Sequence, residues 1–370
     1  MKNFIYSAVI IFTLIFMGNI FSCSQPKNTD RLNAILDSAM ANANIPGLMV
    51  SIVCGDFKWE QTRGYSDFNN KTPMDLNKVY RIGSITKTFT ITAVFQLIDE
   101  GKLSLDDKIN QYLDGIPNGD KITIRQLMNM TSGLYNYSES KDFSDTLKSN
   151  PGKQWTPDDA LAMAFKYPVY FEPGTGFHYS NTNTIVLGKL LEKLTGKTVA
   201  ENITERIIKP LGLKNTYVVN KTTMPAEYIH GHSESFTNPK EYYDVSEVYN
   251  SSLAGAAGNI VSNINDLNIY IRALAKGKLI SAKSQAERIQ WTPLDKDDPN
   301  SQYGLGMANF FGGYYGHNGG IPGFVDIAVY SPEKDCSIVM MYNIFTMFGN
   351  QLPNPFPDAV AKQLLAAIGK

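Results

Sequence analysis

The sequence predicts an α+β fold, with an antiparallel β-sheet flanked by helices and a helical segment inserted between its parts. Strand-like patterns lie near both ends of the chain, and helix-like patterns with Pro and Gly breaks fill residues 102–215. Of 370 residues, 43% are hydrophobic and 19% are charged, enough apolar side chains for a folded core. We therefore expect one domain over 30–370, with an α/β region at 30–101 and 216–370 and a helical region at 102–215.

The first elements follow from caps, turns and periodicity. Asp30 can cap a helix that ends near Pro46. Leu48–Cys54 is an apolar strand, turned by a Gly-Asp pair into an alternating partner strand. A helix then runs from about Ser84 to Glu100 and is closed by a glycine.

The later elements return to the sheet. Helical patterns are clear within the inserted segment, and four strands and a final amphipathic helix follow near the C-terminus. The expected helices are Ile124–Met130, Thr184–Thr195 and Pro357–Ile368, and the expected strands are Tyr303–Met307, Tyr314–Gly320, Phe324–Tyr330 and Ser337–Tyr342.

The first 23 residues have the pattern of an export signal. Lys2 precedes a largely apolar run, Phe4–Met17, that is too short to span a bilayer easily. The next residues, Ile20-Phe21-Ser22-Cys23, resemble a bacterial lipobox, in which Cys23 is lipidated and becomes the mature N-terminus. We expect a lipid anchor, a tether at 24–29, and a place in the bacterial envelope, on the periplasmic side or outer membrane. The alternative is an ordinary signal peptide with an incidental cysteine.

The charge balance and the cysteine content limit the classes of partner and cofactor that we expect. The 34 Lys and Arg residues balance 35 Asp and Glu residues, without the basic excess of a nucleic-acid binder. The remaining cysteines, Cys54 and Cys336, lie in apolar strand patterns; the envelope permits a disulfide, but two buried free thiols are the simpler interpretation. No metal or nucleotide motif occurs, so we expect no cofactor, and a monomer acting on a small molecule, peptide or ester.

A first candidate motif is Ser84-Ile85-Thr86-Lys87 at the start of the predicted helix. A spacing of three places both side chains on one helix face, and a desolvated lysine can be the base that a serine nucleophile needs. The same pattern recurs at Ser138–Lys141, in a polar stretch without helical periodicity, and we interpret that copy as surface.

Two further segments complete the candidate site. In Tyr179-Ser180-Asn181, a phenol can serve as a base if a cation such as Lys87 stabilises its phenolate, and Asn181 can hold Lys87 and a substrate carbonyl. In 316–323, His317 is followed by glycines that let a substrate lie against the backbone, where an N–H opposite that of Ser84 would complete an oxyanion hole. The bland alternatives are a capped turn and a Gly-rich hairpin with a buried histidine.

In order and spacing, these three motifs resemble those of the serine β-lactamase and penicillin-binding protein family, in the branch with class C β-lactamases and D-alanyl-D-alanine carboxypeptidases. The resemblance implies Ser84 as acylated nucleophile, and proton transfer by Lys87 and Tyr179. It further implies positioning by Asn181, assistance from His317, and an oxyanion hole from the N–H groups of Ser84 and Gly320. Implied substrate contacts are Asn318, Gly319, Phe143 and Thr146. Further matching stretches are Phe89–Leu103, Thr131–Tyr135, Pro210–Leu213 and Tyr303–Gly306.

One position departs from the carboxypeptidase pattern. Ala308 stands where that enzyme has an Arg for the terminal carboxylate of its peptide, and Asn318 and Gly320 replace two Thr. A carboxylate site without a bidentate Arg loses its strongest partner. We expect an acyl-enzyme hydrolase of amides or esters, most like a D-alanyl-D-alanine carboxypeptidase. The alternatives are a class C-like β-lactamase or small-ester hydrolase, and a penicillin-binding sensor that acylates without turnover.

Overall fold

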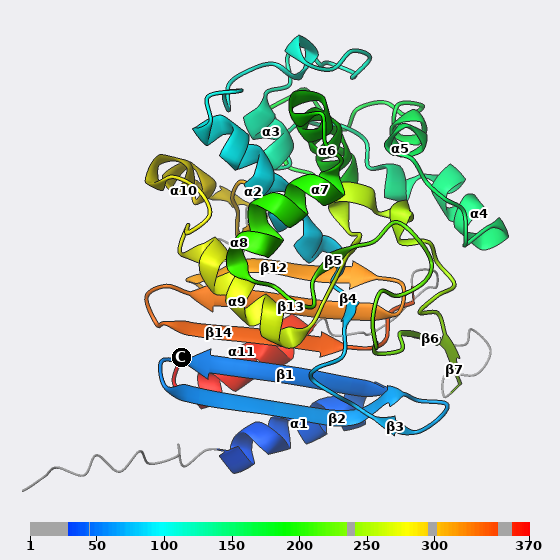
Figure 1. Cartoon of the computed structure of the whole chain (residues 1–370), viewed down its shortest axis with the longest axis vertical. Coiled ribbons are helices and arrows are strands. Elements are labelled where there is room, and N and C mark those ends of the chain that lie inside the picture. The colour runs from blue at the N-terminus through cyan, green and yellow to red at the C-terminus, as the bar shows by residue number, and fades with distance from the viewer. Residues whose placement is uncertain (1–28, 44, 235–240, 295–301, 347–356) are drawn as a thin grey trace, which may run out of the picture.

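A computed structural model describes residues 29–370 except 44, 235–240, 295–301 and 347–356. Its centre is a nine-stranded sheet, antiparallel throughout, with strand order β3-β2-β1-β14-β13-β12-β11-β10-β9 (Figure 1). The N- and C-terminal parts of the chain share this sheet because β1 pairs with β14. The strands are β1 (Gly47–Cys54), β2 (Phe57–Asp67), β3 (Thr72–Pro73), β9 (Thr292–Pro293), β10 (Gln302–Tyr303), β11 (Ala308–Phe310), β12 (Tyr314–Ile321), β13 (Phe324–Ser331) and β14 (Cys336–Tyr342).

Helices cover both faces of the sheet, which confirms the expected fold class. The terminal helices α1 (Thr29–Ala43) and α11 (Pro357–Ala367) pack together on one face. On the other face lie α9 (Ile264–Ala275) and, beyond it, α2 (Thr86–Asp99) (Figure 1). All of β13 is therefore buried, and its apolar side chains alternate between the two cores.

The segment between the two parts of the sheet is helical. Every element that the structure assigns between 102 and 215 is a helix or helical turn, and α6 packs against α2 at its centre (Figure 1). These elements are η2 (Ile109–Gln111), α3 (Ile124–Met128), η3 (Tyr137–Glu139), α4 (Lys141–Ser149), α5 (Pro157–Ala164), α6 (Asn181–Thr195), α7 (Val199–Ile203), the π-turn η4 (Thr204–Ile208) and α8 (Lys209–Leu211).

Short elements connect the two regions. The turns η1, η5 and η6 lie between the helical region and the sheet, and two small sheets lie beside them. The bounds of the three turns are η1 (Gly83–Ile85), η5 (Ser251–Leu253) and η6 (Gly255–Ala257). The strands of the two small sheets are β4 (Tyr80–Arg81), β5 (Tyr217–Val218), β6 (His232–Glu234), β7 (Tyr242–Asp244) and β8 (Ile260–Ser262), and a further helix is α10 (Ala282–Arg288).

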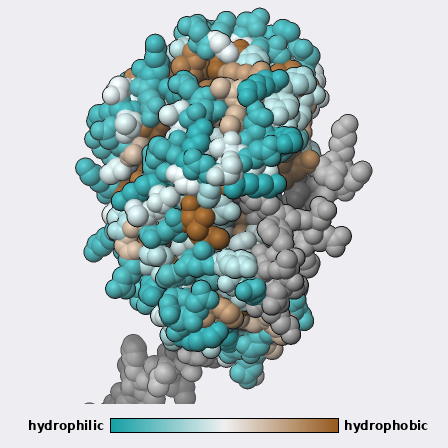
Figure 2. Space-filling view, turned by 90° about the vertical axis from the view of Figure 1, so that its right-hand side faces the viewer, coloured by the Kyte–Doolittle hydropathy of each residue, from teal (hydrophilic) through white to brown (hydrophobic). Residues whose placement is uncertain are grey.

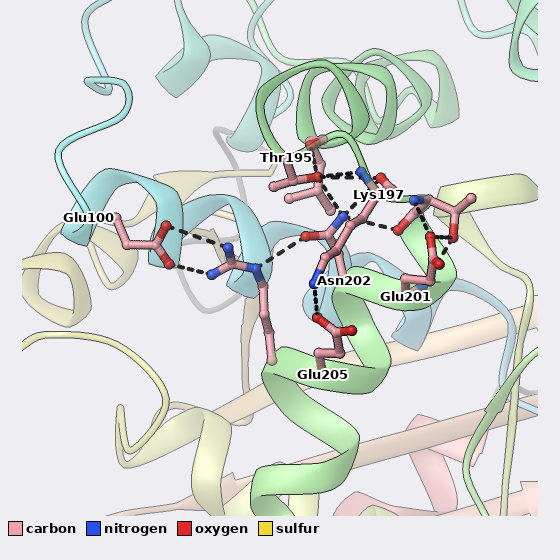
Figure 3. A network of polar contacts seen from close by, with 9 residues as sticks. Glu100, Thr195, Lys197, Glu201, Asn202 and Glu205 are labelled. Atoms are coloured by element: carbon pink, nitrogen blue, oxygen red, sulfur yellow. Dashed lines mark hydrogen bonds and ion pairs between the residues drawn. The ribbon is translucent and has the colours of Figure 1, made fainter.

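A polar network ties the helical region to the end of α2 (Figure 3). Asn202 donates to Thr195 Oγ1 at 2.9 Å and accepts from Arg206 Nε at 3.2 Å, while Arg206 pairs with Glu100. The charged groups are partly exposed, so these contacts contribute little stability each. Their role is to fix where α6, α7 and α2 meet.

Two expectations about the sheet are wrong. Of the predicted strand Tyr303–Met307 only Tyr303 is in a strand, β10, and 304–307 form the turn to β11, because Gly304 N–H bonds the Met307 carbonyl at 2.8 Å and Gly306 adopts φ +73°. The predicted free thiols are joined instead: the register places Cys54 directly opposite Cys336, and their sulfurs form a disulfide. No local sequence pattern indicates this pairing, because the two cysteines are 282 residues apart.

Cys23 and the predicted lipobox lie outside the described residues. Within the described part of the chain, no helix is long and apolar enough to cross a bilayer. The face shown in Figure 2 is mostly hydrophilic, with small separate apolar patches.

Candidate active site

Ser84 lies in the 3₁₀ turn η1, directly before α2, close to its predicted place at a helix start. The preceding glycine is required there. Gly83 has φ +45°, and a Cβ on it would lie 2.7 Å from the backbone nitrogen of Gly320 in β12. The turn that carries the nucleophile therefore rests on the backbone of the strand that carries the second expected oxyanion donor.

Lys87 lies one turn further on and is fully buried. Its Nζ is 2.9 Å from Ser84 Oγ and 3.0 Å from the carbonyl oxygen of Ala257. No described carboxylate lies within ion-pair distance, and burial holds the pKa of Lys87 well below its usual range. A neutral amine in contact with a serine hydroxyl is suited to remove its proton.

Tyr179 precedes α6, and Lys87 Nζ lies 4.9 Å from the centre of its ring. Burial raises the pKa of Tyr179, and the neighbouring Ser84 hydroxyl offsets only part of that rise. In the free site burial favours the neutral form of both groups, which disfavours the expected phenolate stabilised by a charged lysine. Tyr179 is suited to donate a proton, with Lys87 as the first acceptor.

Asn181 is at the start of α6 but does not hold Lys87 as expected. Its side-chain Nδ2 donates to Ser138 Oγ at 2.8 Å, and its backbone N–H donates to Asn136 Oδ1 at 3.1 Å. Ser138 also lines the pocket beside Ser84, so its interpretation as a surface residue is wrong. The local sequence around Ser138 did not indicate that it lines the pocket. The tertiary fold, and no local periodicity, brings η3 to the pocket.

His317 is buried on β12, with both ring nitrogens occupied. Nε2 lies 3.1 Å from the hydroxyl of Tyr303, and Nδ1 contacts the carbonyl oxygen of Asn318. Burial is the main cause that lowers the pKa of His317 to about 3. The imidazole is neutral, and its tautomer follows from these partners: Nδ1–H donates to the carbonyl and the phenol donates to Nε2. Tyr303 is a site residue that the motif search did not single out.

The four residues expected to contact substrate have different positions. Phe143 lines the pocket together with Ser84 and Gly320. Thr146 does not line it, and its hydroxyl bonds the Asp142 carbonyl at 2.7 Å. Asn318 donates to Asp358 Oδ2 at 3.0 Å on the α11 face of the sheet, and Gly319 packs against Asp326. The expectation is therefore wrong for the side chains of Thr146 and Asn318.

The described pocket wall is mostly apolar and carries no Arg or Lys. Ala308, at the position of the missing Arg, is buried against Met130 and Tyr303. The segments 235–240 and 295–301 lie outside the described residues. The wall beside the nucleophile is formed by Ser84, Tyr137, Ser138, Phe143, Asn181, Leu253, Ala254, Ala257, Gly258, Gly320, Ile321 and Pro322.

Known proteins match this chain over most of its length. A D-stereospecific amidohydrolase from Streptomyces sp. is 34% identical, with a TM-score of 0.78 over 85% of this chain and 94% of that chain. A D-amino acid amidase from Ochrobactrum anthropi SV3 is 27% identical, with a TM-score of 0.81 over 92% and 98%. Penicillin-binding protein 4* of Bacillus subtilis is 29% identical over 80% of this chain and 68% of its own length. The Beta-lactamase family model matches residues 32–360, and the chain belongs to that family of serine hydrolases.

Proposed function

We propose that this protein hydrolyses amides or esters of D-amino acids through an acyl-Ser84 intermediate, without requiring a free carboxylate on the leaving side. The observation that carries the chemistry is the buried Lys87 amine, 2.9 Å from Ser84 Oγ and without a carboxylate partner. The substrate class is supported by the pocket wall, which lacks a cation among its described residues, and by the similarity to D-specific amide hydrolases.

The proposed mechanism uses the same groups in acylation and in deacylation. Ser84 Oγ attacks the substrate carbonyl carbon while its proton moves to Lys87 Nζ. The N–H groups of Ser84 and Gly320 bind the oxyanion of the tetrahedral intermediate. Tyr179 then protonates the leaving nitrogen or oxygen, and Lys87 returns its proton to the phenolate. Water repeats the sequence to release the acid from Ser84.

His317 and Asn181 position the reacting groups. His317 is neutral and bonded at both ring nitrogens, so it acts through Tyr303, whose ring meets that of Tyr179 edge-on at 6.1 Å. Asn181 holds Ser138 at the mouth of the pocket, where an amide can be shared with a substrate carbonyl. These contacts give the helical region a direct part in binding.

The test compares matched substrates. We would measure kcat/KM for a D-Ala-D-Ala peptide, the same peptide amidated at its C-terminus, D- and L-amino acid amides, a simple ester and a chromogenic cephalosporin. Ser84→Ala serves as the background. We expect amidation to change kcat/KM less than about threefold, and D-amides to be preferred over L-amides.

Three results would redirect the proposal. A strong preference for the free peptide acid, where a charge-assisted hydrogen bond contributes about 1.5–3 kcal/mol, would indicate a strict carboxypeptidase. Turnover of the cephalosporin alone would indicate a β-lactamase. A covalent adduct without turnover on any substrate would indicate a sensor.

We also propose that Cys23 anchors the protein to the envelope, on the basis of the lipobox-like Ile20-Phe21-Ser22-Cys23. Stable anchoring needs more than one acyl chain, which a lipidated N-terminal cysteine carries. Cys23→Ser should leave the precursor uncleaved or mislocalised. Intact-mass analysis of the membrane fraction tests this, and a mature protein without acyl mass would contradict it.

A further inference from the structure

Asp326 is a buried carboxyl group that the mechanism above does not use. It lies in β13, has no exposed surface, and neither of its oxygens has a hydrogen-bond partner among the described residues. An ionised carboxylate in such a place is strongly destabilised, whereas a protonated one needs only an acceptor for its hydrogen. The surroundings of Asp326 supply that acceptor.

We take the backbone carbonyl of Ile82 as the candidate acceptor. Asp326 is directly opposite Gly319 in the register of β12 and β13. A Cβ on Gly319 would lie 2.1 Å from Asp326 Oδ1 and 2.3 Å from the Ile82 carbonyl oxygen, so both oxygens border the same small space beside Gly319. The Ile82 carbonyl accepts the Ile85 N–H at 3.1 Å and has a second lone pair.

A hydrogen bond between Asp326 and the Ile82 carbonyl would join the two backbone segments that lead to the oxyanion donors. Ile82 is two residues before Ser84, and Gly319 is one residue before Gly320. The same segments already touch, since a Cβ on Gly83 would lie 2.7 Å from Gly320 N. β12 pairs with β11 only over Tyr314–Gly316, so beyond that stretch η1 is its neighbour on this side.

We propose that Asp326, in its neutral form, is a positioning residue that donates a hydrogen bond to the Ile82 carbonyl and thereby holds the Ser84 and Gly320 N–H groups in register. The inference rests on the proposed acyl-Ser84 mechanism, whose oxyanion hole it completes. An oxyanion hole works only if its donors are fixed before the charge develops. The carboxyl group of Asp326 would supply this rigidity from β13, the strand next to β12, without touching the substrate.

The neighbouring titratable groups give the proposal a pH signature. Tyr80 of β4 and Asp358 of α11 are the groups whose charge reaches Asp326, and His317 of β12 and Lys87 of α2 belong to the site itself. Burial, and then Asp358, hold the pKa of Asp326 well above its usual range. The neutral carboxyl is therefore present below that raised pKa and is lost as pH rises through it. Ionisation would repel the Ile82 carbonyl and oppose the oxyanion, so activity should fall on the alkaline side.

Two substitutions separate positioning from bulk structure. Asp326→Asn keeps a donor of similar size that cannot ionise. We expect its kcat within about threefold of the natural protein, and its alkaline limb removed or moved to higher pH. Asp326→Ala removes the donor. We expect its kcat to fall about 10–100-fold with KM within threefold, less than the 10²–10³-fold typical of deleting an oxyanion donor outright.

A boronic acid that forms a tetrahedral adduct with Ser84 gives a second readout, since its affinity should fall in Asp326→Ala by the same factor as kcat. Asp266→Asn is the matched control: this buried carboxylate accepts from Asn215 N–H at 2.7 Å, is not part of the pocket lining, and should leave the alkaline limb in place.

The outcomes distinguish the two proposals. Asp326→Asn that keeps the alkaline limb, or that is as slow as Asp326→Ala while equally folded by circular dichroism, would overturn the positioning role. Asp326→Ala with natural kcat would also overturn it. If Asp326→Ala does not fold, the pH profile of Asp326→Asn decides. Activity retained by Ser84→Ala would instead overturn the acyl-Ser84 mechanism.

Discussion

Two of the Ser-x-x-Lys segments in the chain, Ser84–Lys87 and Ser138–Lys141, place their serines beside the same pocket, and only the first has the geometry expected of a nucleophile and its base. At Ser84–Lys87 the lysine is fully buried and contacts the serine hydroxyl. At Ser138–Lys141 the lysine side chain is 80% exposed and pairs with Asp145, which raises its pKa. Both serines line the pocket, so the difference lies in the lysines.

The environment of the lysine, more than the spacing of the two residues, distinguishes the two segments. Ser84 and Lys87 lie on one continuous turn into α2, whose other side is the hydrophobic core. Ser138 is on η3 and Lys141 begins α4, with Ser140 capping that helix between them. A serine gains a base only where burial keeps the neighbouring amine neutral.

Ser84→Ala should give the largest effect, because the nucleophile has no substitute among the described pocket residues. We expect a loss of several orders of magnitude in kcat and no covalent adduct, as for nucleophiles that act as a unit with their base. Steady-state kinetics and intact mass measure both. An active Ser84→Ala variant would remove the contrast between the two segments.

Lys87→Met should lower kcat by about 10²–10⁴-fold, the usual contribution of a general base. In the proposed mechanism the lysine works as the neutral amine, so activity should rise with pH through the lowered pKa of Lys87 and be lost below it. Lys141→Met is the matched control and should change neither rate nor pH profile. An acid limb that persists in Lys87→Met would assign that limb to another group.

Tyr179→Phe removes the buried hydroxyl and keeps the ring. We expect turnover to fall by about 10²-fold or more, mainly on amides, because a poor leaving group needs protonation more than an activated ester does. The ratio of amide to ester kcat/KM measures this. Equal losses on both substrates would point to a role in the attack step instead.

Ser138→Ala should have the smallest effect of the series. Ser138 Oγ accepts the side-chain N–H of Asn181, so its loss frees that amide without removing a reacting group. We expect a change of a few-fold, in KM more than in kcat, with Ser149→Ala on exposed α4 as the control. A loss as large as that of Tyr179→Phe would place Ser138 in the chemistry.

The sequence predicts the elements better than their contacts. Local patterns locate β1, α2, β12, β13 and β14 within a residue or two, because apolar periodicity and caps are local signals. The turn at 304–307 was missed because its glycines and apolar residues also fit a strand. Contacts between distant segments, such as Cys54 with Cys336 or Tyr303 with His317, depend on strand register, which no local pattern encodes.

The site likewise has features that the sequence predicts and features that only the structure shows. The spacing of Ser84 and Lys87 predicts that they meet, the family resemblance implies that Tyr179 and Gly320 join them, and the structure brings the four together. The protonation of the site was predicted less well. A phenolate beside a charged lysine is reasonable in water, but only the three-dimensional burial of both groups shows that their neutral forms are favoured.

The pH dependence of Ser84 labelling tests most directly whether burial activates one of the two serines. A fluorophosphonate should modify the peptide containing Ser84 and leave the peptide containing Ser138 unmodified, as mapped by mass spectrometry. The labelling rate should reach half its maximum well below the ordinary lysine pKa of about 10.4. An adduct on Ser138, or a rate that rises only near that ordinary value, would contradict a neutral, buried Lys87 as the activating base.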